Sequence, residues 1–455
     1  MKIKRQHRGK FLVVFAIYLL WTSCRPATEM ILTPQEVALH WADLTLYITK
    51  NTPANSPTFA SRAIGYIGLT MYESIVHGYP SYQSVAGQLN GLGELPQPEA
   101  NAPYDWVLAL NAGQAEILRT IYIQTSDSNK TRIDELERQV YETYAGQLDD
   151  PEVGTRSAEY GKSIADAIFE WSKTDGGHRG YLHNFDKELT FPQRPGGWVP
   201  PLYGQAISHY PLHPHWGENR TFLKENSDLP IPYMIPYDTM PGSPYYEQYN
   251  AVYQQDKILN QDEKEQALWW GDDPDVTFTP PGHSYYIATK VIRAKNPDVI
   301  VCAEAFAKVG MAVADAFINC WKWKYHYFSE RPNTFIPKFI DPEFVSFWPD
   351  PPFPAFPSGH AINAAAAATV LKNEFGPWFH FIDSSHYGRP FDEFRQTAFV
   401  PQSFDSFWQV AIETADSRFF GGIHTHQDND TGMEQGALIA ENVNHLHWKK
   451  ENAGG

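Results

Sequence analysis

Helical periodicity runs through most of this chain and limits what it can fold into. Apolar residues recur at positions i, i+3, i+4 and i+7 in one segment after another, a spacing that places them on one face of an α-helix. No comparable stretch shows the alternation of apolar and polar residues that is typical of a half-buried strand. The sequence therefore predicts an all-α protein made of helical bundles, and we expect two packed bundles of the four-helix type.

The predicted helices form two halves on either side of residues 180–219, which are rich in proline, glycine, aromatic residues and histidine. We expect this middle segment to be a long ordered loop and not a boundary between independent domains, so residues 24–455 are predicted to form one unit. The first half contains the predicted helices Pro34–Ile48, Phe59–Val76, Trp106–Tyr122, Arg132–Tyr144 and Thr155–Trp171. The second half begins near Tyr245 and contains Gln261–Trp270, His283–Ala294, Val299–Trp323, His360–Phe375, Phe404–Phe420 and Gln427–His445.

The N-terminus has the pattern of an export signal. Five lysines and arginines precede the apolar run 11–21, and Thr-Ser-Cys follows it. Eleven apolar residues are too few to cross a bilayer as a helix. The pattern predicts a signal peptide over residues 1–23, with Cys24 as a lipid-modified residue of a bacterial lipoprotein. Trp21 departs from the usual aliphatic residue at that position, which leaves plain secretion open. We therefore expect an exported protein that is secreted, periplasmic or anchored in the outer membrane, with membrane contact only through this lipid.

The charge balance excludes one class of partner and draws attention to one group of cations. A formal net charge of −17 argues against nucleic acid or an anionic membrane surface as a partner. Against this acidic background, Lys324, Arg331 and Arg418 occur in the three most distinctive stretches of the last third of the chain. We interpret them as candidates for a cationic pocket that binds an anion.

The first distinctive stretch is Pro-Ser-Gly-His at residues 357–360, directly before an alanine-rich helical segment. The start of a helix offers free backbone N–H groups and the positive end of the helix dipole, which together favour an anion. Ser358 can donate its hydroxyl, Gly359 allows close approach of the backbone, and His360 can direct an imidazole at the bound group. Taken alone, the tetrapeptide is equally consistent with a serine N-cap beside a chance histidine.

The second stretch covers residues 417–428, SRFFGGIHTHQD. Two glycines should end the preceding helix just after Arg418, so that His424 opens the next one. Asp428 follows His424 by four residues, and we expect the two to share a helix face, with the carboxylate accepting from one ring nitrogen. The other nitrogen then keeps a lone pair for a nucleophilic or ligand role. The alternative is a purely structural Asp–His pair, and His426 is expected to point the other way.

The third stretch is KYHYFSERP, residues 324–332. Lys324 ends a long predicted helix, and Arg331 follows seven residues later beside Pro332, which we expect to stop helical structure. Two cations so placed can converge on one site. Surface charges at a helix end are the ordinary alternative for this stretch alone.

Together, the three stretches resemble a known signature. The pattern K-x6-R-P, P-S-G-H and S-R-x5-H-x3-D is similar to that of the superfamily uniting type-2 phosphatidic acid phosphatases, bacterial acid phosphatases and vanadium-dependent haloperoxidases. This all-α superfamily binds phosphate or vanadate, both tetrahedral oxyanions. The resemblance implies that His360 is the acid–base residue and that Asp428 orients His424. It implies that the anion is held by Lys324, Arg331, Arg418, Ser358 and the Gly359 amide.

Local details favour the haloperoxidases. Residues 351–361, PPFPAFPSGHA, resemble the vanadium chloroperoxidase segment PPFPAYPSGHA, and Phe353 falls where that family has an aromatic residue in the halide pocket. Residues 417–428 resemble the haloperoxidase pattern SRIFLGVHWRFD, although Thr-His-Gln replaces Trp-Arg-Phe at 425–427. Residues 272–274 (DDP) and 279–283 (TPPGH) also resemble segments of bacterial haloperoxidase-like proteins.

The resemblance therefore implies a vanadium-dependent haloperoxidase with one orthovanadate per subunit and His424 as the axial vanadium ligand. Hydrogen peroxide would oxidise a halide, iodide or bromide in preference to chloride, to hypohalous acid, which halogenates an organic acceptor. The alternative is a secreted acid phosphatase of the same superfamily, in which His424 forms a phosphohistidine. An exported lipoprotein that binds phosphate without turnover is a third interpretation, but it gives no use for two differently placed histidines.

Overall fold

The structure, a computed structural model, describes residues 32–206 and 208–450. The predicted signal peptide over residues 1–23 and the lipid site at Cys24 lie outside the described residues. Within them the predicted all-α architecture is confirmed, because fourteen α-helices and a single two-stranded sheet make up the regular structure of the described part. No helix among the described residues combines the length and the apolar content required to span a membrane.

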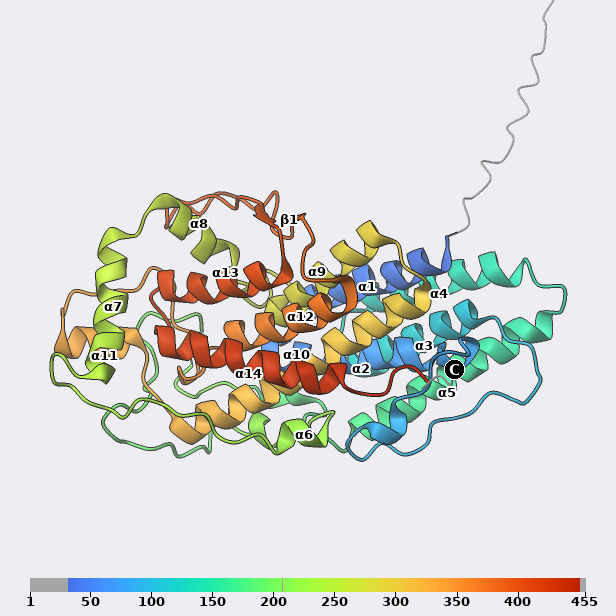
Figure 1. The fold of residues 1–455 in the computed structure, drawn as a ribbon, viewed down its shortest axis with the longest axis horizontal. Helices are drawn as coiled ribbons and strands as arrows, with labels where there is room; N and C mark the ends of the chain where they lie inside the picture. Colours follow the sequence, from blue (N-terminus) through green and yellow to red (C-terminus); the bar gives the residue numbers. More distant parts are fainter. Residues whose placement is uncertain (1–31, 207, 451–455) are drawn as a thin grey trace, which may run out of the picture.

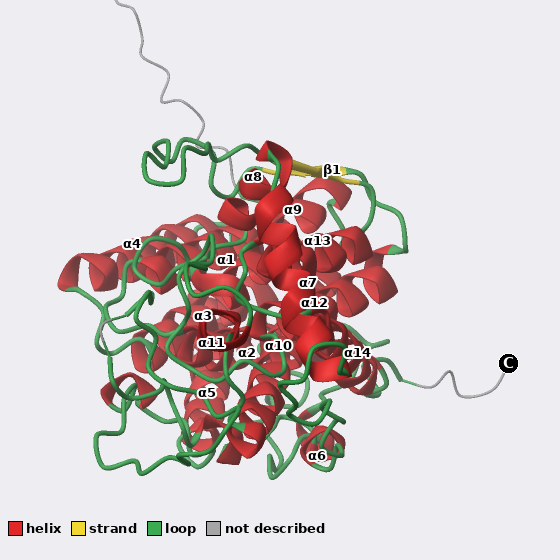
Figure 2. Cartoon of the chain, turned by 90° about the vertical axis from the view of Figure 1, so that its left-hand side faces the viewer, coloured by secondary structure: helices red, strands yellow, loops and turns green. Residues whose placement is uncertain are grey.

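The helices before the long loop are α1 (Pro34–Lys50), α2 (Pro57–Glu73), α3 (Trp106–Ile121), α4 (Asp127–Ala145) and α5 (Pro151–Ser172). Those after it are α6 (Lys224–Ser227), α7 (Pro244–Ile258), α8 (Gln261–Trp269), α9 (Thr279–Lys295), α10 (Val299–Tyr327), α11 (Pro332–Phe339), α12 (Gly359–Phe375), α13 (Phe407–Phe420) and α14 (His426–Asn444). Strands β1 (Phe381–Asp383) and β2 (Gln402–Phe404) pair antiparallel. In Figure 1, α3, α4 and α5 lie toward one end of the long axis, α7, α8 and α11 lie at the other end, and α10 and α12 lie between them. Figure 2 shows the small sheet at the edge of the helical body.

Most predicted helices are present, and their ends follow local capping signals. Residues 180–219, described except for residue 207, carry the short 3₁₀ turns Gly180–Leu182 and Trp216–Glu218 and otherwise follow the predicted loop. The expectation that Pro332 stops helical structure is wrong. It opens α11 at the first helical position, where the missing N–H of proline costs no hydrogen bond. Helix α10 instead ends at Tyr327, after which Phe328 adopts a left-handed conformation with φ 47°.

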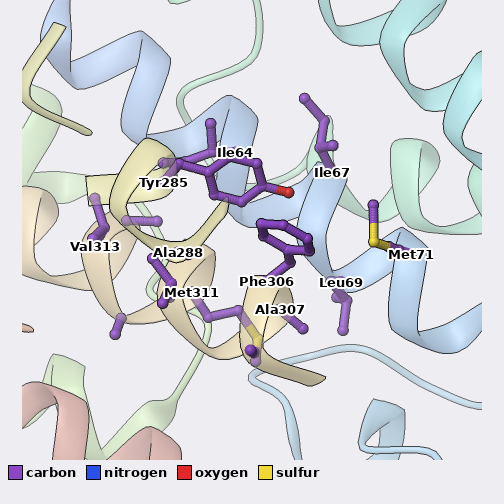
Figure 3. Close-up of a cluster of buried hydrophobic side chains, with 14 of the residues drawn as sticks. Ile64, Ile67, Leu69, Met71, Tyr285, Ala288, Phe306, Ala307, Met311 and Val313 are labelled. Carbon is purple, nitrogen blue, oxygen red and sulfur yellow. The ribbon is translucent and has the colours of Figure 1, made fainter. Parts of the chain in front are cut away.

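Helix α10 is the central helix of the fold. It is buried along nearly its whole length and packs against α2, α9, α12 and α14. In Figure 3, side chains from three of these helices meet in one apolar cluster, and the ring centres of Tyr285 on α9 and Phe306 on α10 lie 4.7 Å apart. This packing fixes the direction of α10, and with it the position of Lys324 in its last turn.

The contact between α12 and α14 brings two of the three sequence motifs together. Two glycines on α14 allow a very close approach, since a Cβ on Gly432 would lie 2.9 Å from the Ser358 carbonyl oxygen and one on Gly436 would lie 2.2 Å from that of Ile362. The Ser358 N–H then donates to the carbonyl oxygen of Asp428 at 2.9 Å. The start of α12 and the start of α14 are therefore held against each other.

We expect Gly436→Ala to destabilise the protein, because its new Cβ would overlap the backbone of α12 and not a movable side chain. Such overpacking costs about 1–3 kcal/mol, more than the roughly 1 kcal/mol that alanine gains over glycine in a helix. Urea denaturation would measure the change in unfolding free energy. Gly154→Ala on α5 is the matched control, because its Cβ would make only contacts of 3.4 Å or more. Equal stability of the two variants would contradict the close-packing argument.

Candidate active site

Residues of two sequence motifs line one cavity, and Lys324 and Arg331 of the third motif pack against its wall. The cavity has a volume of about 390 Å³, and its lining includes Gly359, His360 and His424 together with three aromatic side chains, Phe317, Trp321 and Phe353. The three predicted cations are at most 1 % exposed. Buried cations need hydrogen bonds or an opposite charge to offset their lost hydration, so the partners of each one show what the cavity can bind.

His424 and Asp428 meet as predicted, but not by sharing a helix face. Helix α14 begins at His426, with Thr425 as its N-cap, so His424 precedes the helix. Asp428 is the third residue of the helix and forms a capping box with Thr425, whose N–H donates to the Asp428 carboxylate at 2.9 Å. The Asp428 Oδ2 atom also lies 3.0 Å from Nδ1 of His424. The capping box thus holds the carboxylate that orients the histidine.

The hydrogen bonds of His424 define its tautomer. Its Nε2 atom lies 3.1 Å from Nη1 of Arg331, and a guanidinium can only donate. Nε2 is therefore the acceptor, and Nδ1 carries the proton that it donates to Asp428. Burial, followed by the charges of Arg331, Lys324 and Arg418, lowers the pKa of His424 well below its usual value. The result is a neutral imidazole with a lone pair on Nε2 in the wall of the cavity.

His360 is the second residue of α12 and lines the same cavity. Its Nε2 atom is buried and has no hydrogen-bond partner among the described residues. Burial and then the charge of Arg418 lower the pKa of His360 well below its usual value. A buried ring nitrogen without a partner beside a cavity is suited to a bound polar ligand.

Ser358 and Gly359 stand at the N-terminus of α12, as the sequence predicts. Ser358 is the N-cap, and its Oγ accepts from the Ala361 N–H at 3.3 Å, which leaves the hydroxyl proton available to a ligand. Gly359 is the first helical residue and lines the cavity. The helix dipole and the free amides of this first turn therefore favour an anion at this wall of the cavity.

Lys324 and Arg331 converge, as predicted, on Phe353. The Lys324 Nζ and the Arg331 guanidinium carbon each lie 5.2 Å from the centre of the Phe353 ring. The Lys324 ammonium donates to the carbonyl oxygens of Pro354, Ala355 and Pro357 at 2.6–2.9 Å. Burial lowers the pKa of Lys324 to about 7, whereas the three carbonyls stabilise its ammonium form. In this arrangement Lys324 holds the loop that carries the Pro-Ser-Gly-His motif.

Arg331 and Arg418 differ in how many of their N–H donors already have partners. Arg331 donates to the carbonyl oxygens of Phe353 and Ile423 as well as to His424. Arg418, in the last turn of α13, donates to Ser417 Oγ and to the Ala267 carbonyl oxygen. Its Nη1 atom is buried without a partner among the described residues. Burial lowers the pKa of Arg418 to about 10, so the group stays cationic. Arg418 therefore has donor capacity left for an anion.

Comparison with known proteins finds similarity to vanadium-dependent haloperoxidases. A model of the vanadium chloroperoxidase second helical-bundle domain matches residues 304–450. A solved bacterial vanadium-dependent iodoperoxidase superposes with a TM-score of 0.78 at 29% identity, covering 92% of this chain and 98% of that one. The vanadium chloroperoxidase of Curvularia inaequalis is 26% identical over 216 residues, 36% of each chain. This chain is therefore similar in sequence and in fold to vanadium-dependent haloperoxidases.

The fold is also shared with more distant proteins. A holo bacterial vanadium-dependent chloroperoxidase superposes with a TM-score of 0.63 at 16% identity, and covers 91% of this chain and 93% of its own. At that level of identity the likeness concerns the helical architecture alone. The part aligned with the Curvularia enzyme spans only about a third of that enzyme's length, 36%.

The donor set fits a tetrahedral oxyanion such as vanadate. Among the described residues, the unpartnered Nε2 of His360 belongs to a side chain that lines the cavity, and the unpartnered Nη1 of Arg418 belongs to a side chain whose charge lowers the His360 pKa. With the Ser358 hydroxyl and the first amides of α12 they supply polar groups that a tetrahedral oxyanion can use. The His424 lone pair supplies one ligand atom for a metal centre.

Several residues of the cavity carry no role in the sequence motifs. Trp321 lies one helical turn before Lys324 on α10, and its ring centre is 4.9 Å from that of Phe353. That three-residue spacing from Lys324 is a sequence signal that could have identified it. Asp272 and Asp273 also line the cavity. The resemblance of residues 272–274 to bacterial haloperoxidase-like proteins was the one sequence signal for them, and it did not place them at the cavity, because helix α13 and the segment after β1 are brought to them only by tertiary packing.

Proposed function

We propose that this protein is a vanadium-dependent haloperoxidase that oxidises iodide or bromide, in preference to chloride, to hypohalous acid with hydrogen peroxide. The observation that carries the proposal is the state of His424: a neutral imidazole, oriented by Asp428, with its Nε2 lone pair beside buried cationic donors in one cavity. The 29% identical iodoperoxidase, which matches over nearly its full length, supports iodide as a substrate.

One orthovanadate per subunit would be held by the residues that the sequence motifs supply. His424 Nε2 would be its protein ligand, and Arg331, Arg418, Ser358 and the Gly359 amide would donate to its oxygens. Lys324, whose ammonium already donates to three carbonyl oxygens, would contribute its charge. When bound, vanadate supplies a Lewis-acidic centre that activates hydrogen peroxide. A ligand at His424 Nε2 takes the place of the Arg331 bond, which frees that guanidinium to donate to the ligand instead.

His360 is the proposed proton carrier. Its lowered pKa keeps the imidazole neutral at ordinary pH, so the unpartnered Nε2 can accept a proton from hydrogen peroxide and return it to the leaving oxygen. The overall reaction takes one halide, one hydrogen peroxide and one proton to one hypohalous acid and one water. A neutral base within the cavity therefore serves both proton movements.

The aromatic wall gives a place for the halide. Phe353, Trp321 and Phe317 line the cavity beside Lys324 and Arg331. Large halide ions are weakly hydrated and lose little on entering such a wall, and aromatic ring edges carry partial positive charge. Iodide is larger and more easily oxidised than bromide or chloride, so we expect this wall to favour iodide. Hypohalous acid then leaves to halogenate an organic acceptor.

An assay on the purified mature chain tests the proposal. We expect protein stripped with EDTA to oxidise iodide and bromide with hydrogen peroxide only after orthovanadate is added, with iodide faster than bromide. The same samples would be tested on para-nitrophenyl phosphate. Phosphate-ester hydrolysis that vanadate inhibits, without any halide oxidation, would show that the protein is an acid phosphatase of the same superfamily.

A further inference from the structure

A second buried network adjoins the cavity but belongs to none of the three motifs. His283, on α9, lies with Nδ1 2.8 Å from Asp272 Oδ2 and with Nε2 2.7 Å from Asp383 Oδ2. His386 Nε2 lies 3.0 Å from the other oxygen of Asp272. All four side chains are at most 3 % exposed. The network therefore joins α9, the end of β1 and the loop after α8 by direct contacts.

The hydrogen bonds indicate that His283 is a buried imidazolium. Both of its ring nitrogens face a carboxylate, and a carboxylate accepts but does not donate, so each nitrogen must carry a proton. Asp383 is further fixed by the Trp269 indole N–H at 2.7 Å and the Ser385 N–H at 2.9 Å. Although burial opposes it, the charges of Asp272 and Asp383 raise the pKa of His283 to about 10. The cluster thus places one positive charge, on His283, between two negative ones, on Asp272 and Asp383.

Asp272 connects this cluster to the candidate active site. It lines the large cavity together with His360 and His424, and it shares with His360 and His283 a smaller neighbouring cavity. Its charge raises the pKa of His360, against the stronger lowering by burial and Arg418, and it raises that of Arg418. The charged and titratable groups around Asp272 are Asp273, His283, His360, Asp383, His386, Arg389 and Arg418.

We propose that His283 and Asp383 are positioning residues for the oxyanion site, and that their buried ion pair holds Asp272 as a fixed, ionised carboxylate in the cavity wall. This inference rests on the proposed function. An ionised Asp272 offsets part of the charge of the buried cations and supports the protonated form of His360. The negative charge of this wall then stays constant over the working pH range, because the imidazolium does not titrate there.

A metal site is the rival interpretation of the same residues. Ligand atoms of Asp272, His283 and His386 lie within 4.8 Å of one another. A metal at His283 would require that its ring nitrogen give up its proton. Both ring nitrogens already have carboxylate partners at hydrogen-bond distance, and the imidazolium supplies the positive charge that a metal would otherwise provide. The geometry therefore favours the ion pair.

The protonation state of His283 can be measured on the whole chain. In protein labelled with ¹⁵N-histidine, we expect one imidazolium signal, with protons on both ring nitrogens, to persist at pH 8 and to be missing from His283→Gln. Metal analysis of the same sample should find no stoichiometric divalent ion. A neutral His283 at pH 8, or one bound metal per chain that His283→Gln removes, would overturn the proposal.

The positioning role has a separate readout in oxyanion affinity. Without the imidazolium, burial raises the pKa of Asp272, so this carboxyl takes up a proton as the pH falls. The site then loses a negative charge and binds an anion more tightly. The measured quantity is the ratio of the orthovanadate dissociation constant of His283→Gln to that of wild type. We expect this ratio to fall by about tenfold between pH 8 and pH 5.5, as for removal of one charge near a binding site. Asp383→Asn should change in the same direction by less.

The matched control is Asp405→Asn, which breaks an exposed His–Asp pair, His380 with Asp405 at 2.8 Å, on the surface. For this variant, the ratio of the orthovanadate dissociation constant to that of wild type should stay constant with pH. Orthophosphate would be measured beside orthovanadate, since both are tetrahedral. A pH-independent ratio for His283→Gln would overturn the positioning role alone. Oxyanion binding with the expected pH dependence but without halide oxidation would overturn the proposed function alone.

Discussion

His424→Ala is expected to abolish halide oxidation, lowering the rate by on the order of a thousandfold or more, as for loss of a residue that touches the reacting centre. The substitution removes the Nε2 lone pair in the cavity wall and leaves the Asp428 carboxylate and Arg331 Nη1 without this partner. Binding of orthovanadate should weaken in parallel. Iodide oxidation and equilibrium dialysis with vanadate would measure the two effects on the same sample.

His426→Ala is the matched control for this variant. His426 lies two residues further on, is exposed, and stacks on Phe419 with ring centres 3.9 Å apart. Its loss should leave both vanadate binding and turnover close to those of wild type. Full activity in His424→Ala would remove the basis for the assignment, under the peroxidase and the phosphatase interpretations alike.

The helical architecture was predictable because its signals are local. Periodicity and capping residues act within one or two turns, so predicted helices such as 106–122 and 261–270 end within one residue of the observed α3 and α8. Helix α11 was not predicted. It contains Pro332 and Pro337, which disfavour a helix in isolation. Its stability comes from tertiary packing, with the Phe335 ring 4.3 Å from that of Tyr249 on α7.

The residues of the site were predictable from the sequence, but the hydrogen-bond partner of each donor and acceptor was not. Residue types and spacing indicated that Lys324, Arg331, Arg418, His360 and His424 would gather around an anion. The three carbonyl partners of Lys324 lie 30 to 33 residues away from it. These contacts depend on the path of the loop that precedes α12, and the local sequence pattern does not indicate that path. The free donors of the site are therefore known only once the fold is known.

The network around His283 was even less predictable from the sequence. Its members come from three segments, and His283 and Asp383 are 100 residues apart. Each residue alone resembles an ordinary buried polar side chain, and only their contacts reveal a charge cluster. The sequence did offer the similarity of residues 272–274 and 279–283 to bacterial haloperoxidase-like proteins, and the structure places both of these segments beside the cavity.

The second large effect is expected from Asp428→Asn, which keeps the size of the side chain but removes its negative charge. The Asp428 Oδ2 atom accepts both the Nδ1 proton at 3.0 Å and the Thr425 N–H at 2.9 Å. An asparagine oxygen in the same place can keep both bonds, but it is neutral and a weaker acceptor. The His424 imidazole then loses the carboxylate that raises the basicity of its Nε2 lone pair. Replacing a carboxylate that acts through a ligand histidine lowers activity or ligand affinity by on the order of ten- to a hundredfold.

Asp430→Asn is the matched control, because Asp430 lies two residues further along α14 and is exposed. Circular dichroism and urea denaturation would confirm that both variants keep the fold, and ¹⁵N chemical shifts of the His424 ring would report the tautomer directly. We expect Nδ1 to carry the proton in wild type and in both variants, and turnover and orthovanadate affinity to fall only in Asp428→Asn. If Asp428→Asn kept wild-type turnover and affinity, the charge of this carboxylate would not be what makes His424 a ligand. The cationic donors, with His360, would then account for most of the oxyanion binding.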